Sequence, residues 1–305
     1  MMHTQIAINH TNPYDFSHNL RSHGWAALLP FSYLPDLDAF SRVEQLPCGQ
    51  VVEMVVSDAA SGRLPHADIR VQVAHPARLE KTDRNYLISS VRHMLRLDED
   101  LAPFYILCRE KGGVWKNLDA GQGFLLRSPT LFEDMVKVIL TTNIQWSGTK
   151  RMVRELVQQY GEPLWRDAAR KTFPTPAALM RDTLDVFQRK VRLGYRAAYV
   201  YQLAAECAEK PEKYLALADP SIPAGDLLKQ LLAIKGIGNY AAASILMLLG
   251  RYEYIPVDTV FRDFVRQKYQ LELPIHQQAA VNLYQEWGRW KYLAYWFDMY
   301  TWEPS

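Results

Sequence analysis

The segment Leu231–Ala242 constrains this chain more than any other part of its sequence. An apolar helix end leads into the tight turn Gly236-Ile237-Gly238, and an alanine-rich run from Tyr240 to Leu249 begins a second helix. Two glycines around one aliphatic residue permit positive φ angles and leave no side chains over the amides. Those amides lie at a helix N-terminus, where the helix dipole favours an anion. We therefore interpret the turn as a site for a phosphate of a nucleic-acid backbone.

An aspartate follows this turn by 20 residues. Asp258 comes after Pro256-Val257 and precedes the expected helix Thr259–Tyr269. An Asp before a helix is a common N-cap. A fixed carboxylate can also stabilise positive charge on a sugar ring and activate a water molecule. The two roles are compatible, and the sequence leaves both open.

Together the turn and the aspartate resemble the helix-hairpin-helix of the DNA glycosylase superfamily, which includes endonuclease III, 8-oxoguanine glycosylase and 3-methyladenine DNA glycosylase II. That family has Gly-aliphatic-Gly between two helices and, about 20 residues later, an apolar residue followed by Asp. The resemblance implies that Asp258 is catalytic. It also implies that a set of turn residues binds the DNA backbone, with no cofactor beyond a structural monovalent cation at the hairpin. The set is Gly236, Ile237, Gly238 and Asn239.

Tyr240 stands where strand-cutting members of the family have a lysine nucleophile. A lysine amine can form a Schiff base with the sugar, whereas a phenol cannot. We therefore expect a monofunctional glycosylase that leaves an abasic site, with Tyr240 against the extruded base or packed between helices. The alternatives are a bifunctional 8-oxoguanine-type glycosylase/lyase and a non-catalytic protein that binds DNA damage. The missing lysine favours an alkylated purine as substrate.

A second segment, Leu140–Trp146, interrupts two expected helices with polar and aromatic residues. It resembles the family segment that enters the minor groove and fills the space left by a flipped base. The resemblance makes Asn143, Ile144 and Gln145 candidates for intercalation and Trp146 a candidate for the base pocket. The alternative is an ordinary turn between helices, with Trp146 in the core.

The C-terminal end is rich in aromatic residues at helical spacing. Such residues are mostly core, but this part resembles the last helix of the family, whose residues wall the base pocket. Electron-rich rings hold cationic alkylated bases by cation–π attraction. We take Trp290, Trp296 and Phe297 as further pocket candidates. A Gly194-Tyr195-Arg196 element is also shared with the superfamily, and we expect Arg196 to bond backbone carbonyls.

The order of these patterns predicts an α+β fold. Short β-rich runs at 51–56 and 69–73 indicate an N-terminal antiparallel β lobe over residues 1–100, followed by a helical body over 101–305 that carries the helix-hairpin-helix. The segment Trp25–Leu29 reads as a strand or a short helix. Asp226 is expected to cap the first hairpin helix. We expect further helices over 85–95, 132–140, 148–160, 177–193, 197–209 and 259–269.

Composition limits the class of protein. Apolar residues make up 49% of the chain, which indicates a globular protein. The net charge is +2, but residues 131–270 hold 20 Lys/Arg and 15 Asp/Glu, so the hairpin-bearing region is the basic part. Cys48, Cys108 and Cys207 are widely spaced, so we expect no metal centre. The N-terminus is too polar for a signal peptide, and no apolar run reaches membrane-spanning length. We expect a monomer in the cytoplasm, associated with the nucleoid in a bacterium, that binds double-stranded DNA with a damaged base.

Overall fold

The computed structural model describes residues 2–21, 23–58, 69–118, 120–271 and 282–302. The chain forms two compact units. The first contains Met1–Glu99 and Gly121–Tyr214, and the second contains Asp100–Ala120 and Leu215–Ser305.

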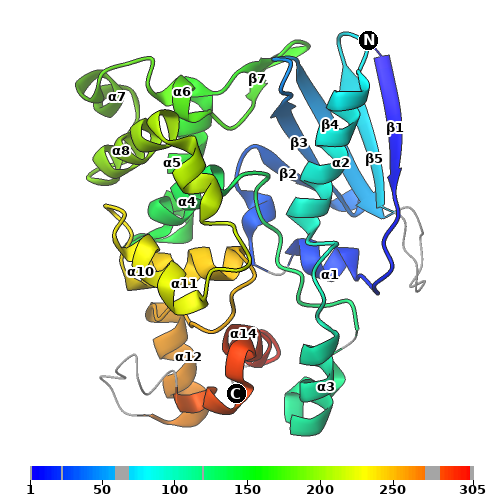
Figure 1. Ribbon diagram of the computed structural model, residues 1–305, viewed down its shortest axis with the longest axis vertical. Helices are drawn as coiled ribbons and strands as arrows, with labels where there is room; N and C mark the ends of the chain where they lie inside the picture. The colour runs from blue at the N-terminus through cyan, green and yellow to red at the C-terminus, as the bar shows by residue number, and fades with distance from the viewer. Residues whose placement is uncertain (1, 22, 59–68, 119, 272–281, 303–305) are drawn as a thin grey trace. The chain divides into compact units, whose positions relative to one another are not determined.

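A five-stranded antiparallel sheet is the core of the first unit (Figure 1). Its strand order is β1-β5-β4-β3-β2. The runs predicted at 51–56 and 69–73 are confirmed as β4 and β5, which pair with Val56 opposite Val71. The strands are β1 (Met2–Ile8), β2 (Phe31–Leu34), β3 (Ala39–Gln45), β4 (Val51–Asp58) and β5 (Ile69–His75). The first strand was not predicted, although Ile6 pairs with Val71 of β5.

Helices complete the first unit. Helix α2 (Lys81–Leu95) contacts β1, and a capping box between Glu80 and Asp83 fixes its start. The segment around Trp25 forms a short 3₁₀ helix, Trp25–Ala27, rather than a strand. The other helices are α1 (Phe16–Arg21), α4 (Leu131–Thr141), α5 (Trp146–Tyr160), α6 (Pro176–Leu179), α7 (Leu184–Lys190) and α8 (Arg196–Glu209), and α9 (Pro211–Ala216) lies at the boundary with the second unit. The sheet and helices α4–α8 therefore belong to one unit.

The single helix predicted over 177–193 is wrong, because the chain forms α6 and α7 there. Asp182 lies between them and accepts hydrogen bonds from Tyr160 Oη at 2.8 Å and from Lys190 Nζ at 2.7 Å. In a continuous helix, residues eight apart are separated by about 12 Å along the axis, beyond the reach of this contact. A small hairpin of β6 (Pro163–Leu164) and β7 (Asp167–Lys171), also not predicted, contacts β4 and β3.

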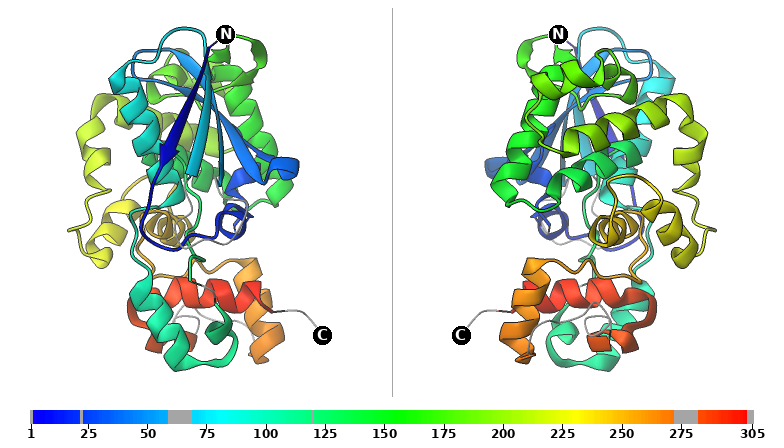
Figure 2. Two further views of the ribbon diagram at one scale, coloured as in Figure 1. Left: turned by 90° about the vertical axis from the view of Figure 1, so that its right-hand side faces the viewer. Right: turned by 90° about the vertical axis from the view of Figure 1, so that its left-hand side faces the viewer.

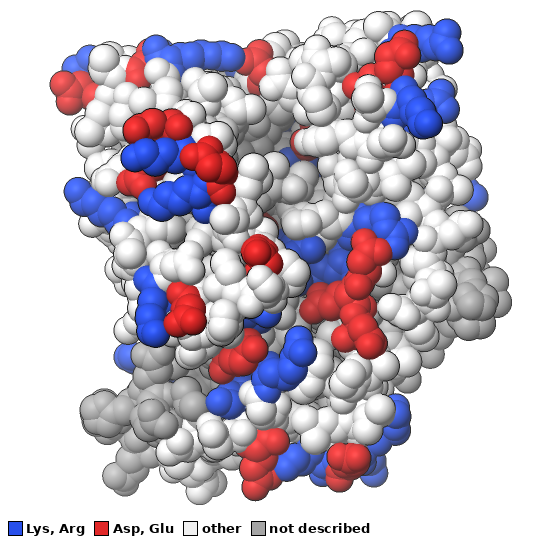
Figure 3. All heavy atoms as spheres, in the orientation of Figure 1, with Lys and Arg blue, Asp and Glu red and all other residues white. Residues whose placement is uncertain are grey.

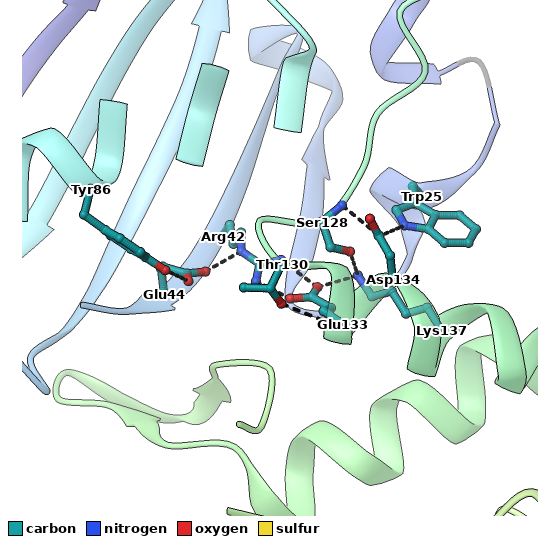
Figure 4. Close-up of polar contacts among 9 residues, drawn as sticks. All are labelled: Trp25, Arg42, Glu44, Tyr86, Ser128, Thr130, Glu133, Asp134 and Lys137. Atoms are coloured by element: carbon teal, nitrogen blue, oxygen red, sulfur yellow. Dashed lines mark hydrogen bonds and ion pairs between the residues drawn. The ribbon is translucent and has the colours of Figure 1, made fainter. Parts of the chain in front are cut away.

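A buried network of charged side chains joins β3 to α4 (Figure 4). Arg42 of β3 donates to both carboxylate oxygens of Glu133 at 2.9 and 2.6 Å, and to Glu44 at 2.6 Å. Lys137 of α4 donates to Glu133 at 2.7 Å. Burial alone would raise the pKa of Glu133, but the charges of Arg42 and Lys137 lower it to about 2. Because breaking a buried ion pair costs about 3–5 kcal/mol, this network fixes α4, which ends directly before the turn at Asn143.

The second unit is helical. Its helices are α3 (Ala102–Lys111), α10 (Ala224–Leu232), α11 (Asn239–Leu248), α12 (Thr259–Tyr269) and α14 (Lys291–Tyr300). The bounds of α12 are those predicted, and α14 crosses it at a steep angle (Figure 2). Asp226 does not cap α10: the helix starts one turn earlier, with Pro223 as N-cap, and Asp226 pairs with Lys229 at 3.0 Å. No helix in the described part of the chain is both long and apolar enough to cross a membrane.

Candidate active site

The turn between α10 and α11 is held from inside by its aliphatic residues. Ile234 and Ile237 are buried, and the amide of Ile237 donates to the carbonyl of Ile234 at 3.1 Å. Gly236 has a φ of 90°, in the region that side-chain-bearing residues rarely adopt. The sequence Gly236-Ile237-Gly238 thus reverses the chain while its middle residue anchors the turn in the core.

The N-terminus of α11 is open. Its N-cap is Gly238, no side chain caps the helix, and both Gly238 and Asn239 are exposed. Nothing lies within 4 Å of the position that a Cβ at Gly238 would occupy. The first amides of a helix have no partner within that helix, and those of Gly238 and Asn239 belong to exposed residues here. This geometry suits a phosphate oxygen that approaches the backbone closely.

Asp258 is the N-cap of α12. Its Oδ1 accepts a hydrogen bond from the amide of Phe261 at 2.8 Å, which confirms the capping role. The residue is half-buried, and burial raises the pKa of its carboxyl group. Hydrogen bonds from the amides of Asp258, Val260 and Phe261 and the charge of Arg262 offset that rise only in part. A carboxyl group with a raised pKa is the kind of group that enzymes use as general bases.

The phenol of Tyr295 lies near this carboxylate. Burial raises the pKa of Tyr295 well above its ordinary value, and the charges of Tyr292, Asp258 and Tyr240 raise it further. These four residues therefore share one electrostatic environment within the second unit. The ring of Tyr295 also meets Phe261 edge-on, with centroids 4.9 Å apart, so α14 packs against the turn that Asp258 caps.

The aromatic residues predicted for the base pocket at the C-terminal end differ in how deeply they are buried. Trp290 and Phe297 are buried and lie against Phe104 of α3, with ring centroids 5.6 and 6.1 Å away. Trp296 is half-buried and stacks on Tyr292 at 6.1 Å, with an interplanar angle of 11°. Trp296 and Tyr240 thus keep accessible surface, whereas Trp290 and Phe297 support the core of the unit; their part in a pocket stays a prediction.

Tyr292 and Tyr295 were missed as site residues. Their spacing offered a signal, because Tyr292, Tyr295 and Trp296 lie at i, i+3 and i+4 and so share one helix face. Sequence alone could not choose this face of α14 over the others, since the helix is aromatic on several sides.

The predicted intercalating residues lie in the first unit, in the turn from α4 to α5. Asn143 is exposed with a φ of 49°, and its amide nitrogen donates to Tyr195 Oη at 3.2 Å. Ile144 is half-buried over Gly148, and Gln145 is exposed as the N-cap of α5. Trp146 is 39% exposed, so the alternative that placed its side chain in the core is wrong.

Arg196 donates hydrogen bonds to backbone carbonyls of this turn, as predicted. It is buried, and its Nε and Nη2 both donate to the carbonyl oxygen of Thr142, with the Nε bond at 3.1 Å. Nη2 also donates to the carbonyl of Asn143 at 3.2 Å. The guanidinium carbon lies 4.4 Å from the ring centroid of Tyr195, which is 53% exposed. Tyr195, not predicted as a site residue, is thus fixed beside Asn143.

The described residues contain no group of three or more His, Cys, Asp and Glu side chains arranged to hold a metal ion. Cys108 and Cys207 are buried, and burial raises the pKa of each thiol to about 12. Neither is a reactive thiolate at neutral pH.

Comparison with known proteins rests on structure alone. No protein-family model matches the chain, and no curated protein matches its sequence. Among solved structures, 3-methyladenine DNA-glycosylase from Archaeoglobus fulgidus superposes with a TM-score of 0.72 at 17% identity, over 97% of this chain and 98% of that one. The chain has the fold of a DNA glycosylase.

Two further structures agree with this. MBOgg1 in complex with a low-affinity DNA ligand superposes with a TM-score of 0.70 at 18% identity, and 98% of each chain is covered. The 8-oxoguanine glycosylase/lyase of Clostridium acetobutylicum, in its apo form, gives 0.66 at 15% identity, also over 98% of each chain. Because both a 3-methyladenine enzyme and an 8-oxoguanine enzyme share this fold, the fold does not select the damaged base.

Proposed function

We propose that this protein is a monofunctional DNA glycosylase that flips a damaged base out of duplex DNA, hydrolyses its bond to the sugar and leaves an abasic site. The observation that carries the proposal is Asp258, a half-buried carboxylate whose pKa burial raises, beside Tyr240 and Tyr295. The shared fold supports the same reaction class.

The first step is docking of the DNA backbone on the α10–α11 turn, which acts as a helix-hairpin-helix. The uncapped amides of Gly238 and Asn239 would bind a phosphate, and Gly236 and Ile237 would hold the turn in shape. Exposed Lys235 adds a positive charge at the same turn. A structural monovalent cation would fit between the turn's carbonyls and a phosphate.

The second step is extrusion of the damaged nucleotide. Taking a base out of the stack costs a few kcal/mol, and a side chain that fills the gap offsets this cost. Asn143 is suited to this role because it is exposed on a turn whose carbonyls Arg196 holds. Ile144 or Gln145, which follow Asn143 in the same turn, would serve as the wedge.

The third step is recognition of the extruded base. Tyr240 and Trp296 would stack on it, because both retain exposed surface, and the buried Trp290 and Phe297 would support these rings from the core of the second unit. Electron-rich rings attract a positively charged base, so we propose an alkylated purine as the substrate. This choice also agrees with a tyrosine at position 240, where an imine-forming lysine would be needed for strand cleavage.

The fourth step is hydrolysis. As the bond between the base and C1′ breaks, positive charge develops on the sugar ring. The carboxylate of Asp258 would stabilise this charge and orient or deprotonate the attacking water. Its role as N-cap is part of the mechanism, since the Phe261 amide fixes the carboxylate in one position.

A panel of duplexes, each with one defined lesion, tests the proposal. The panel contains 3-methyladenine, 7-methylguanine, 8-oxoguanine, a deaminated base and a mismatched pyrimidine. We expect strand breaks at an alkylated purine only after alkali treatment. Breaks before alkali, or a covalent adduct trapped by borohydride, would identify a lyase instead. Binding to lesion duplexes without alkali-labile sites anywhere in the panel would identify a damage-binding protein.

A further inference from the structure

Helix α5 presents a basic face that the proposed function has not used. Lys150, Arg151 and Arg154 are all exposed, and they lie at i, i+1 and i+4, within one face of a helix. The opposite face, which includes Met152 and Leu156, is buried. The helix is therefore amphipathic, with its cations concentrated on the solvent side.

These three cations have no carboxylate partner among the described residues. Other cations of the same unit are engaged within the protein: Arg181 pairs with Glu162 at 2.5 Å and Lys190 with Asp182 at 2.7 Å. On the face of the protein in Figure 3, Lys and Arg side chains are likewise mixed with Asp and Glu. Three positive charges along a single helix face, free of carboxylates among the described residues, are suited to bind an anion from outside the chain.

The one acidic residue of α5 is used within the protein. The carboxylate of Glu155 accepts a hydrogen bond from the backbone amide of Arg192 at 2.7 Å. This contact places the segment before Tyr195 alongside α5 and brings a further exposed cation, Arg192, to the same helix. Glu155 therefore ties two segments together, and its carboxylate is already engaged.

The basic face starts where the intercalating turn ends. Trp146, the first residue of α5, follows Asn143–Gln145 directly, and Arg154 lies eight residues further on, roughly 12 Å along the axis. Successive phosphates of one DNA strand are about 3.4 Å apart along the duplex axis, so this length spans roughly three base steps. A duplex whose gap is filled by Asn143 has its flanking phosphates within this range.

We propose that Lys150, Arg151 and Arg154 bind the phosphates of the DNA strand next to the flipped nucleotide, as a second backbone contact besides the α10–α11 turn. The inference rests on the proposed function for the place of the DNA. Contacts of Lys and Arg with phosphates position the DNA and carry no information on base identity, so this face would bind damaged and undamaged duplexes alike.

The test is the salt dependence of binding to an undamaged duplex, measured by fluorescence anisotropy on the full-length protein. The variant Lys150→Gln/Arg151→Gln/Arg154→Gln removes three charges from α5. The matched control, Arg78→Gln/Lys81→Gln/Arg84→Gln, removes three exposed charges at the start of α2 in the same unit. Three phosphate contacts contribute about −2.7 to the slope of log K against log salt, or roughly 40-fold in affinity between 50 and 200 mM salt.

We expect the α5 variant to lose most of this slope and the α2 control to keep the wild-type slope. Equal slopes for the two variants would overturn the inference. Excision by the wild-type protein on the lesion panel is measured in parallel, so the two proposals fail separately. Excision with equal slopes refutes the α5 contact alone, whereas a changed slope without any excision refutes the glycosylase proposal alone.

Discussion

Replacing Asp258 separates its two roles, because asparagine keeps the helix cap and removes the charge. The Oδ1 atom of Asp258 lies 2.8 Å from the Phe261 amide nitrogen. In Asp258→Asn the side-chain oxygen can still accept this hydrogen bond, and Asn caps helices as well as Asp does. Asp258→Ala loses the cap, which costs about 1 kcal/mol of the free energy of unfolding. Asp258→Ala should therefore be less stable than Asp258→Asn, whereas both variants should lose activity.

The raised pKa of Asp258 also predicts how the free energy of unfolding changes with pH. Burial raises the pKa of Asp258 above its ordinary value of 3.8, so the folded state favours the protonated form. The stabilisation from that proton is complete below 3.8 and is lost as the pH rises through the raised value. At neutral pH the wild type thus holds a disfavoured charge, and Asp258→Asn should be at least as stable. This advantage should shrink as the pH falls toward 3.8.

The catalytic expectation is larger. Loss of a positioned general base lowers a rate by about 10²–10⁴-fold, and loss of charge stabilisation acts in the same direction. Single-turnover excision should fall by at least this factor in both variants, while binding to a lesion duplex stays within about twofold. Urea unfolding at several pH values and alkali-labile site formation measure the two effects on the same samples. Asp258→Asn that excises at the wild-type rate would refute the reasoning.

Three further predictions concern the turns. Gly238→Ala should weaken duplex binding with little change in stability, because the backbone at Gly238 is extended and a Cβ there meets open space. Gly236 has a φ of 90°, so Gly236→Ala should lower the free energy of unfolding in urea by about 1–2 kcal/mol. An equal loss of stability in both variants would contradict this. Asn143→Gly keeps the left-handed turn and removes the amide, so single-turnover excision should fall while stability changes by less than about 1 kcal/mol; an unchanged rate would exclude Asn143 from the gap. Arg196→Ala deprives two carbonyls of a charged donor and should cost about 2 kcal/mol, with partial recovery in Arg196→Lys; no change in the urea midpoint would disprove the clamp.

Local signals in the sequence were enough to predict several elements of the fold. Helix α12 has the predicted bounds because Asp258 supplies an N-cap and an amphipathic run follows it. Helix α4 begins after Thr130, a good N-cap residue whose side chain accepts from the Glu133 amide. The glycine turn was found from residue type alone, since few residues other than glycine adopt the φ of Gly236.

Features that depend on distant partners were not predictable in this way. Glu133 pairs with Arg42, which is 91 residues away, and nothing local in either segment indicates the partner. The same holds for Tyr295, whose neighbours Asp258 and Tyr240 come from two other segments of the second unit. Asp226 looked like an N-cap, but α10 starts at Ala224 with Pro223 as its N-cap, and the side chain of Asp226 pairs with Lys229 instead.

The most direct test of the account is the release of the free base. A duplex with a single alkylated purine is incubated with wild-type protein and with Asp258→Asn, and the supernatant is analysed by mass spectrometry beside a count of abasic sites. We predict one intact free base for each abasic site with the wild type, and none with Asp258→Asn at equal DNA occupancy. Base release by Asp258→Asn at the wild-type rate, or abasic sites without a matching free base, would contradict hydrolysis driven by this carboxylate.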